Sequence, residues 1–294
     1  MKREGFLQFL KHERLQQSSI HEHMQNLKRF KEWATKSGYT TIERLNYNEL
    51  LGYVHDLKKK GLAVSTINIR LNSLRKYYDF IKEQGITEFN PAKNLHIKGA
   101  VKTIIHQPLT YQELEELYGE YTKERDFYRE QKHREAHKRN GIVLGLMIWQ
   151  GIHSGELQKL QVEHVDLSKG TIYIPATRRS NSREIKLEVR QIISLHHYLT
   201  ETSFTTTTEG LTPLFNNNTH NMVQALVQEL KGLNGQIKNA AHIRSSVILH
   251  WLRMYDKRTV QHMAGHKYIS SVEHYQVQEL TGLTDLLTKH HPFS

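Results

Sequence analysis

The sequence predicts a mainly α-helical protein of two domains, with a small three-stranded antiparallel sheet in the second domain. Apolar residues recur at steps of three and four over most of residues 6–85, which is the helical period. A strand-like pattern replaces this period only between residues 165 and 187. The 294 residues are enough to build two ordinary hydrophobic cores.

Four amphipathic helices are expected before residue 91, and their short connections predict a small all-helical domain over residues 1–91. The first covers residues 6–10, the second begins at Ser18 or Ser19 and ends at Gly38, the third covers residues 48–60, and the fourth covers residues 65–85. Asn90-Pro91 interrupts the pattern, and the polar, basic residues 92–108 are expected to form a linker.

Residues 109–294 are expected to form the second domain. Thr110 and Glu113 have the spacing of a capping box, so a helix is expected to start there and to continue into the charged stretch 123–139. An apolar helix follows over residues 142–149. Three strands are then expected over residues 165–167, 171–174 and 183–187, followed by helices over residues 189–199 and 222–230.

The charge of the chain indicates a polyanionic partner. The formal charge is +11, and residues 1–108, with 19 Lys+Arg and 10 Asp+Glu, carry +9 of it. This asymmetry predicts that the first domain supplies much of the grip on nucleic acid, although a basic solvated surface without a partner is the alternative. The residues expected to lie over phosphates, where they fix position without reading sequence, are Lys28, Arg29, Lys58, Lys59, Lys60, Arg70, Arg75 and Lys76.

Composition also excludes several classes of site. Without cysteine there is no disulfide framework, thiolate zinc site or cysteine nucleophile. The 20 histidines form no group with metal-site spacing, and no Walker-type loop occurs, so neither a metal nor a nucleotide cofactor is expected. The chain has no run of about 18 apolar residues, so we expect a soluble protein of the cytoplasm with no membrane partner.

Three residues near the end of the chain suit one chemical task. Tyr275 follows His266 by nine positions, and Arg244 lies about one helix upstream. A tyrosine hydroxyl forms covalent intermediates with phosphorus, while arginine and histidine neutralise the charge that builds on phosphate oxygens. The alternative is that Tyr275 is one of fourteen tyrosines and only fills a helix interface.

Together with Gly151-Ile-His-Ser-Gly-Glu-Leu157 ahead of the predicted sheet, these residues make nearly the whole chain resemble the tyrosine recombinases of the phage integrase family. The similarity is to the two-domain form typical of Xer-type and mobile-element integrases. It implies a helical core-binding (SAM-like) domain and a mixed α+β catalytic domain that close on duplex DNA. It also implies a homotetramer on two synapsed duplexes and a reaction that needs no cofactor.

The resemblance assigns roles to individual residues. Tyr275 corresponds to the nucleophile, which leaves a 3′-phosphotyrosyl link and a free 5′-hydroxyl. Arg244 and His266 correspond to residues that bind non-bridging oxygens of the scissile phosphate. Residues 280–287 resemble the C-terminal helix that such proteins dock onto a neighbouring protomer, although a helix that folds back on its own domain is the alternative.

The chain departs from the family pattern at three positions. His153 stands where an arginine is usual, and Arg178, with the DNA-contacting candidate Arg179 beside it, stands where a lysine acts as the acid. Ala241 takes the place of a further histidine or lysine, with His242 displaced by one position. Two interpretations stay open: a recombinase in which a protonated His153, or His242, recovers part of the lost function, or an inactive paralogue that binds DNA as an architectural protein.

Overall fold

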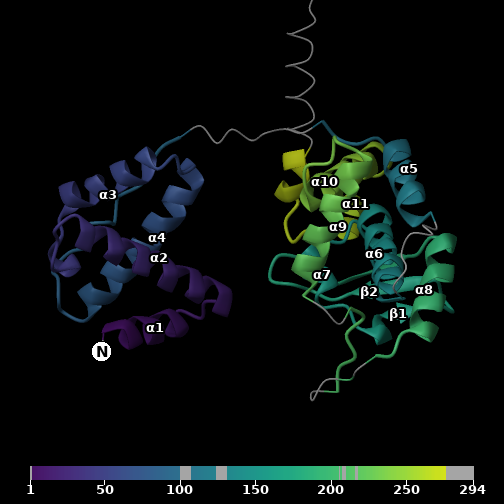
Figure 1. The fold of residues 1–294 in the computed structure, drawn as a ribbon, viewed down its shortest axis with the longest axis horizontal. Helices are drawn as coiled ribbons and strands as arrows, with labels where there is room; N and C mark the ends of the chain where they lie inside the picture. Colours follow the sequence, from purple (N-terminus) through teal and green to yellow (C-terminus); the bar gives the residue numbers. More distant parts are fainter. Residues whose placement is uncertain are drawn as a thin grey trace, which may run out of the picture. The chain divides into compact units, whose positions relative to one another are not determined.

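The chain divides into two compact units, residues 1–103 and 104–294, which Figure 1 shows with their helices and strands labelled. The structure is a computed structural model, and it describes residues 2–99, 107–123, 131–204, 206, 210–215 and 218–275. Most of these residues are helical, and the described strands form one three-stranded antiparallel sheet. The predicted fold class is therefore confirmed.

The first unit consists of four helices around an aromatic core. Phe6, Phe30, Tyr53, Tyr77 and Tyr78 are each at most 1% exposed in this core. The helices are α1 (Lys2–His12), α2 (Gln17–Lys36), α3 (Tyr47–Lys59) and α4 (Val64–Glu83), with a short 3-10 turn, η1, at Ile42–Arg44. Four amphipathic helices thus bury one apolar face each, as the periodicity of the sequence predicts.

Two helix starts differ from the prediction. Ser18 and Ser19 lie inside the first turn of α2, which begins after Gln16 without a side-chain cap. Helix α3 begins at Tyr47, because the side chains of Asn46 and Glu49 form a capping box there.

The beginning of the expected linker packs on the first unit. Ala92 and Leu95 are buried in the same core as the four helices. The Asn68 side chain donates to the carbonyl of Ile97 and accepts from its N–H, both at 3.0 Å. A sequence without helical period is therefore held in place through residue 97 by side chains of the first unit.

The second unit is a helical domain with its sheet at one side. Its helices are α5 (Tyr111–Thr122), α6 (Gln131–Trp149), α7 (Ser154–Leu157), α8 (Val189–Glu201), α9 (Thr219–Leu233), α10 (Ala240–Met254) and α11 (Lys257–Ala264), with a 3-10 turn, η2, at Val162–His164. The strands β1 (Val165–Asp166), β2 (Thr171–Ile174) and β3 (Arg183–Lys186) pair in sequence order, with Ile172 opposite both Val165 and Ile185.

Helix α6 joins part of the expected charged stretch to the apolar helix that follows it. The capping box of Thr110 and Glu113 is present. However, α5 ends at Thr122 and a separate helix begins at Gln131, so the prediction that one helix continues from Thr110 into the charged stretch is wrong. Residues 124–130 lie outside the described part of the chain. From Asn140 to Trp149 every residue of α6 is buried, so its second half forms the centre of the domain.

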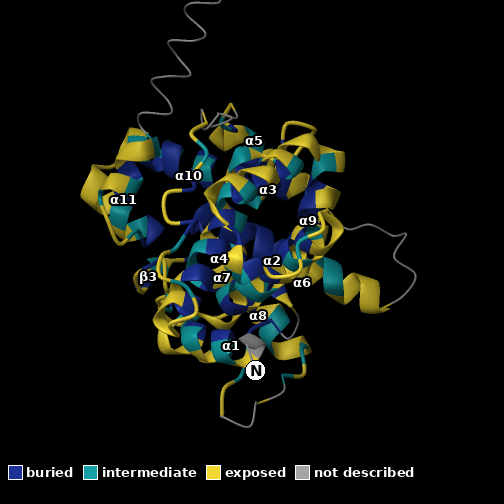
Figure 2. Ribbon diagram, turned by 90° about the vertical axis from the view of Figure 1, so that its left-hand side faces the viewer, coloured by how far each residue is buried: buried dark blue, intermediate teal, exposed yellow. Residues whose placement is uncertain are grey.

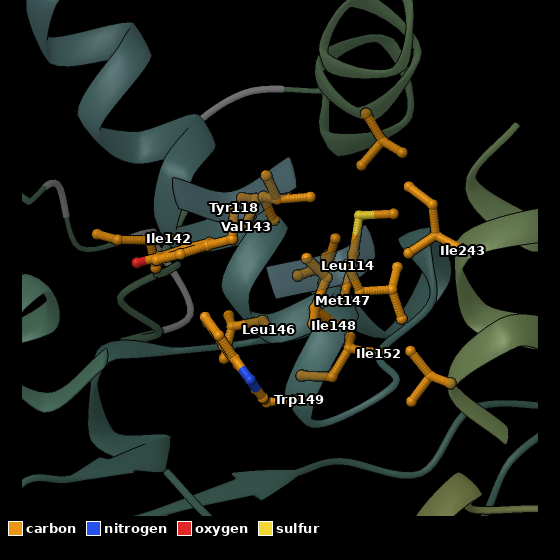
Figure 3. Close-up of a cluster of buried hydrophobic side chains, with 14 of the residues drawn as sticks. Leu114, Tyr118, Ile142, Val143, Leu146, Met147, Ile148, Trp149, Ile152 and Ile243 are labelled. Atoms are coloured by element: carbon orange, nitrogen blue, oxygen red, sulfur yellow. The ribbon is translucent and has the colours of Figure 1, made fainter. Parts of the chain in front are cut away.

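This core leads directly to two of the predicted site residues. Figure 3 shows side chains of α6 packed against Leu114 and Tyr118 of α5, with Ile243 of α10 on the other side. Ile152 and Ile243 are buried, and each immediately precedes a candidate, His153 or Arg244. Figure 2 shows the same division of the helices into buried inner faces and exposed outer faces. The core therefore fixes the backbone from which these two candidates extend.

Candidate active site

Arg244 connects α10 to the end of α11. Its side chain is 11% exposed, and its Nη2 donates to the carbonyl of Ala264, the last residue of α11, at 2.6 Å. Burial lowers the pKa of Arg244, and the carboxylate of Glu156 works against this shift. The guanidinium is therefore a buried cation placed where the chain leaves α11 and enters the Gly265-His266 segment.

Gly265 ends α11 in the left-handed region, with φ of 69°. A Cβ at this position would lie 2.3 Å from Nη1 of Arg183. The N–H of Asn181 donates to the Gly265 carbonyl at 2.9 Å, and Ser180 forms an isolated β-bridge with His266. The turn between β2 and β3 is thus attached to the loop that carries His266.

Tyr275 lies beside His266, with 5.9 Å between the ring centroids. Burial raises the pKa of the Tyr275 phenol, while the charge of Arg244 lowers it. Burial, together with Arg244 and Arg183, lowers the pKa of His266 to about 4. Nε2 of His266 is buried and has no hydrogen-bond partner among the described residues. A phenol, a neutral imidazole and a guanidinium therefore meet in one half-buried site.

The ion pair of Glu156 and Arg183 lies under this site. Both side chains are 0% exposed, and Arg183 donates Nη1 to Oε1 at 2.6 Å and Nη2 to Oε2 at 3.1 Å. Burial raises the pKa of Glu156, but the hydrogen bonds and charge of Arg183 outweigh it, so the pKa is lowered to about 2. Sequence reasoning missed both residues. The signal was available, because Arg183 alternates with Ile185 and Leu187 and so occupies an inward-facing position of its strand.

His153 caps the short helix α7 with its ring. Its Nδ1 accepts from the N–H of Gly155 at 3.0 Å, so the ring proton is on Nε2, which lies 3.7 Å from Oε1 of Glu156. Burial lowers the pKa of His153; Glu156 opposes this, and nearby arginines lower it further. The expected protonated His153 is therefore disfavoured in the DNA-free site, since a proton on Nδ1 would break the cap.

Arg178 and Arg179 are both exposed in the turn between β2 and β3. Thr177 closes this turn, because its hydroxyl accepts from the N–H of Arg179 and of Ser180. The charge of Arg179 is among the causes that lower the pKa of His153, after burial, Arg244 and Arg183. Position in the sequence singled out Arg178, and the role of either arginine in the site stays a prediction.

His242 lies on another side of α10 from Arg244, because two residues of a helix are about 200° apart. Its Nε2 lies 2.8 Å from the carbonyl of Gln107, and its N–H donates to the side chain of Asn239, the N-cap of α10. His242 therefore anchors the segment that enters the second unit.

The basic candidates of the first unit lie on α2, on α4 and at the end of α3. Arg29 of α2 and Arg70 of α4 both lower the pKa of the Tyr53 hydroxyl, which burial raises. Lys60 is paired with Asp56 at 2.6 Å, and Lys76 is paired with Glu13. The remaining candidates, Lys28, Lys58, Lys59 and Arg75, are distributed over α2, α3 and α4.

Two family models match the chain. Residues 107–279 match the model of the phage integrase family, and residues 4–85 match that of the phage integrase N-terminal SAM-like domain. The chain belongs to the phage integrase family. The SAM-like domain and the catalytic domain of this family correspond to the predicted two-domain architecture. A search of curated proteins found no match to this chain.

Solved structures of tyrosine recombinases share this fold. XerH recombinase bound to its palindromic difH substrate in a post-cleavage complex is 20% identical, with 92% of this chain and 79% of that chain covered and a TM-score of 0.69. The Tn1549 transposon integrase in complex with a circular intermediate DNA is 13% identical, with 94% of each chain covered and a TM-score of 0.65. At these identities the similarity concerns the fold. None of the described helices is long and apolar enough to cross a membrane.

The stability of the catalytic unit is expected to fall as pH decreases from 6.5 towards 4. The pKa of His266 is about 4 against an ordinary 6.5, so in this range the unfolded chain binds a proton that the folded chain excludes. Glu156 lowers the stability further only below about pH 4.5, because its pKa is 4.5 in the unfolded chain and about 2 in the folded one.

Thermal denaturation at pH 7 and pH 5 tests this linkage. The loss of thermal stability between pH 7 and pH 5 should be smaller in His266→Gln than in the parent. His262→Gln, which changes an exposed histidine on α11, should behave like the parent. An equal loss in all three proteins would show that His266 does not control the pH dependence.

Proposed function

We propose that the chain is a site-specific DNA recombinase, or integrase, in which Tyr275 is the nucleophile. The observation that supports this function best is the convergence of Tyr275, His266 and Arg244, with 5.9 Å between the two rings and with Arg244 opposing the rise that burial causes in the pKa of the phenol. Burial keeps the phenol of Tyr275 protonated in the DNA-free site, and the neighbouring cation Arg244 opposes that effect, so it would stabilise the phenolate as the tyrosine attacks.

In the proposed reaction the Tyr275 oxygen forms a bond to the phosphorus of a DNA phosphodiester. The bond from phosphorus to the 5′-oxygen breaks, the phenolic proton passes to water, and the 5′-oxygen leaves with a proton. The product is a 3′-phosphotyrosyl link. A 5′-hydroxyl from the same or a partner strand then attacks this link, restores the diester and releases the tyrosine. This type IB topoisomerase-like exchange conserves the number of ester bonds, so it requires neither ATP nor a metal.

The other residues of the site have roles that follow from their protonation states. Arg244 donates to a non-bridging oxygen of the phosphate. Neutral His266 and neutral His153 each have one ring N–H to donate. The guanidinium at position 178 is a poor acid for the 5′-oxygen, because an arginine gives up a proton poorly. We therefore expect turnover to be slow rather than absent.

The DNA partner is proposed to be duplex DNA, held as two synapsed sites by a tetramer, and the place of action is proposed to be the cytoplasm. XerH and the Tn1549 integrase, which share the fold, are described as DNA complexes. In the present chain the first unit carries most of the net charge. Residues 280–287, the predicted docking helix, lie outside the described residues.

Covalent trapping tests the function. The protein is incubated with nicked duplexes drawn from the DNA that flanks its own gene, denatured, and examined for an adduct by mass spectrometry. An adduct on Tyr275 supports the recombinase. No adduct, on DNA that the protein demonstrably binds, would favour the alternative function, an architectural DNA-binding protein. His153 and Arg178, which replace a guanidinium and an acid of the family pattern, are the observation in favour of that alternative.

The two arginines of the turn are expected to differ in their effect on cleavage. With saturating DNA, Arg179→Ala should slow adduct formation about 10- to 100-fold, because it removes a cation that acts on the site. Arg178→Ala removes the same charge from the neighbouring residue, which is not among the main charges acting on His153, and should change the rate by less than about threefold. Single-turnover rates on one nicked substrate give the comparison. The reverse ranking would return the role in catalysis to Arg178.

A further inference from the structure

The buried charges at the site do not balance. Arg183 and Arg244 contribute two guanidiniums, and Glu156 contributes one carboxylate, with exposed fractions of 0%, 11% and 0% for the three side chains. His153 is neutral, as its hydrogen bond from Gly155 shows. A surplus positive charge therefore lies in a desolvated region, which costs free energy unless an anion arrives to compensate it.

The geometry decides which of the two guanidiniums the carboxylate neutralises. Glu156 bonds Arg183 at 2.6 and 3.1 Å, through both oxygens, whereas Nη1 of Arg244 lies 3.6 Å from the nearer oxygen. Nη1 of Arg244 is buried and makes no hydrogen bond to any described residue. Glu156 also accepts from the backbone N–H of His153 at 3.1 Å, which fully occupies Oε2. Glu156 is thus hydrogen-bonded to Arg183 and only in longer ion-pair contact with Arg244, whose Nη1 keeps an unsatisfied donor.

Arg183 is held in this position from several sides. It begins β3 and is packed under Gly265, where any Cβ would lie 2.3 Å from its Nη1. Its charge lowers the pKa of His266 and of His153. The guanidinium is therefore fixed, has no exposed surface, and acts on the site only through its neighbours.

We propose that Arg183 is a positioning residue that occupies Glu156 and so leaves the guanidinium of Arg244 available to an anion. This inference rests on the proposed function, in which the anion is the scissile phosphate. A histidine at position 153 cannot supply a permanent positive charge to the site. Arg183 of β3 supplies it instead, because it neutralises the carboxylate of Glu156, which would otherwise pair with Arg244.

The proposal makes opposite predictions for one and for two substitutions. In Arg183→Met the carboxylate of Glu156 turns to Arg244, so phosphate affinity should fall about tenfold. Adduct formation should slow about a hundredfold. In Arg183→Met combined with Glu156→Gln no carboxylate competes, while the glutamine oxygen still accepts from His153, so both quantities should return towards the parent values. Arg183→Lys keeps the positive charge but cannot bond both oxygens of Glu156 at once, so it should give an intermediate loss of phosphate affinity and of the rate of adduct formation.

The experiment uses the full chain and two readouts. Inorganic phosphate is titrated while the ring signals of His266 are followed by NMR, and single-turnover adduct formation is measured on the nicked substrate. Arg190→Met combined with Glu115→Gln is the matched control, because it removes an exposed ion pair with a distance of 3.0 Å. Thermal denaturation of every variant shows which of them fold.

The results separate the two levels of the proposal. Recovery of phosphate binding in the double variant supports the role of Arg183, even if the parent forms no adduct and the recombinase function fails. A double variant that binds phosphate no better than the single one overturns the role of Arg183, even if the parent forms the adduct. If Arg183→Met does not fold, the phosphate affinities of Arg183→Lys and of the double variant are compared instead. The proposed role of Arg183 requires the double variant to bind phosphate at least as tightly as Arg183→Lys, and weaker binding overturns it.

Discussion

Tyr275→Phe is expected to abolish the covalent adduct with nicked DNA while leaving DNA binding close to that of the parent. The substitution removes one oxygen and keeps the ring, so the contact with His266 at a centroid distance of 5.9 Å is retained. Without the phenolic oxygen no bond to phosphorus can form, whereas the basic residues proposed to hold the DNA backbone are unchanged.

The control for this variant is Tyr268→Phe. Tyr268 lies in the same segment but is 71% exposed, so its hydroxyl faces water rather than the site. Adduct formation and DNA affinity should both match the parent. A Tyr275→Phe protein that still forms the adduct would remove Tyr275 as the nucleophile and move the search to another hydroxyl of the catalytic unit.

Gly265→Ala is expected to be the most destabilising single substitution near the site. An alanine at φ of 69° is strained, and its Cβ would lie 2.3 Å from Nη1 of Arg183. Arg183 is buried and held by Glu156, so it has no room to move without weakening that ion pair. Breaking a buried pair costs about 3–5 kcal/mol, to which the left-handed backbone adds about 1–2 kcal/mol.

Gly210→Ala is the matched control, since Gly210 has a similar φ of 76° but no described atom within 4 Å of the Cβ position. It should lose only about 1–2 kcal/mol. Denaturant unfolding, followed by the fluorescence of Trp149 and Trp251 in the catalytic unit, measures the difference. Equal losses in the two variants would mean that backbone strain alone sets the effect, and that Arg183 yields to the methyl group.

The site contains two kinds of charge, which respond differently to DNA. The Glu156–Arg183 pair is internal and keeps its charges over the neutral range, because the pKa of Glu156 is lowered to about 2. His153 and His266 have lowered pKa values in the DNA-free site, where burial and arginine neighbours disfavour their charged forms. An arriving phosphate opposes those arginines and raises both histidine pKa values.

Local patterns in the sequence were sufficient to predict much of this molecule. The helical period indicated α2, α3 and α4, and the change of period between residues 165 and 187 indicated the three strands. The chemistry of Tyr275, His266 and Arg244, read with their order along the chain, pointed to phosphate chemistry. These features are local, because a period or a motif depends on residues within a few turns of one another.

Contacts between distant elements needed the tertiary structure. The carboxylate of Glu156 and the guanidinium of Arg183 are separated by 27 positions, and they meet only in the folded domain. Which ring nitrogen of His153 holds the proton depends on a helix cap. Sequence by itself determined the types of helix, strand and reactive side chain in this protein. Packing alone decided which charges are buried together, because burial sets both the cost of a charge and the strength of its partner.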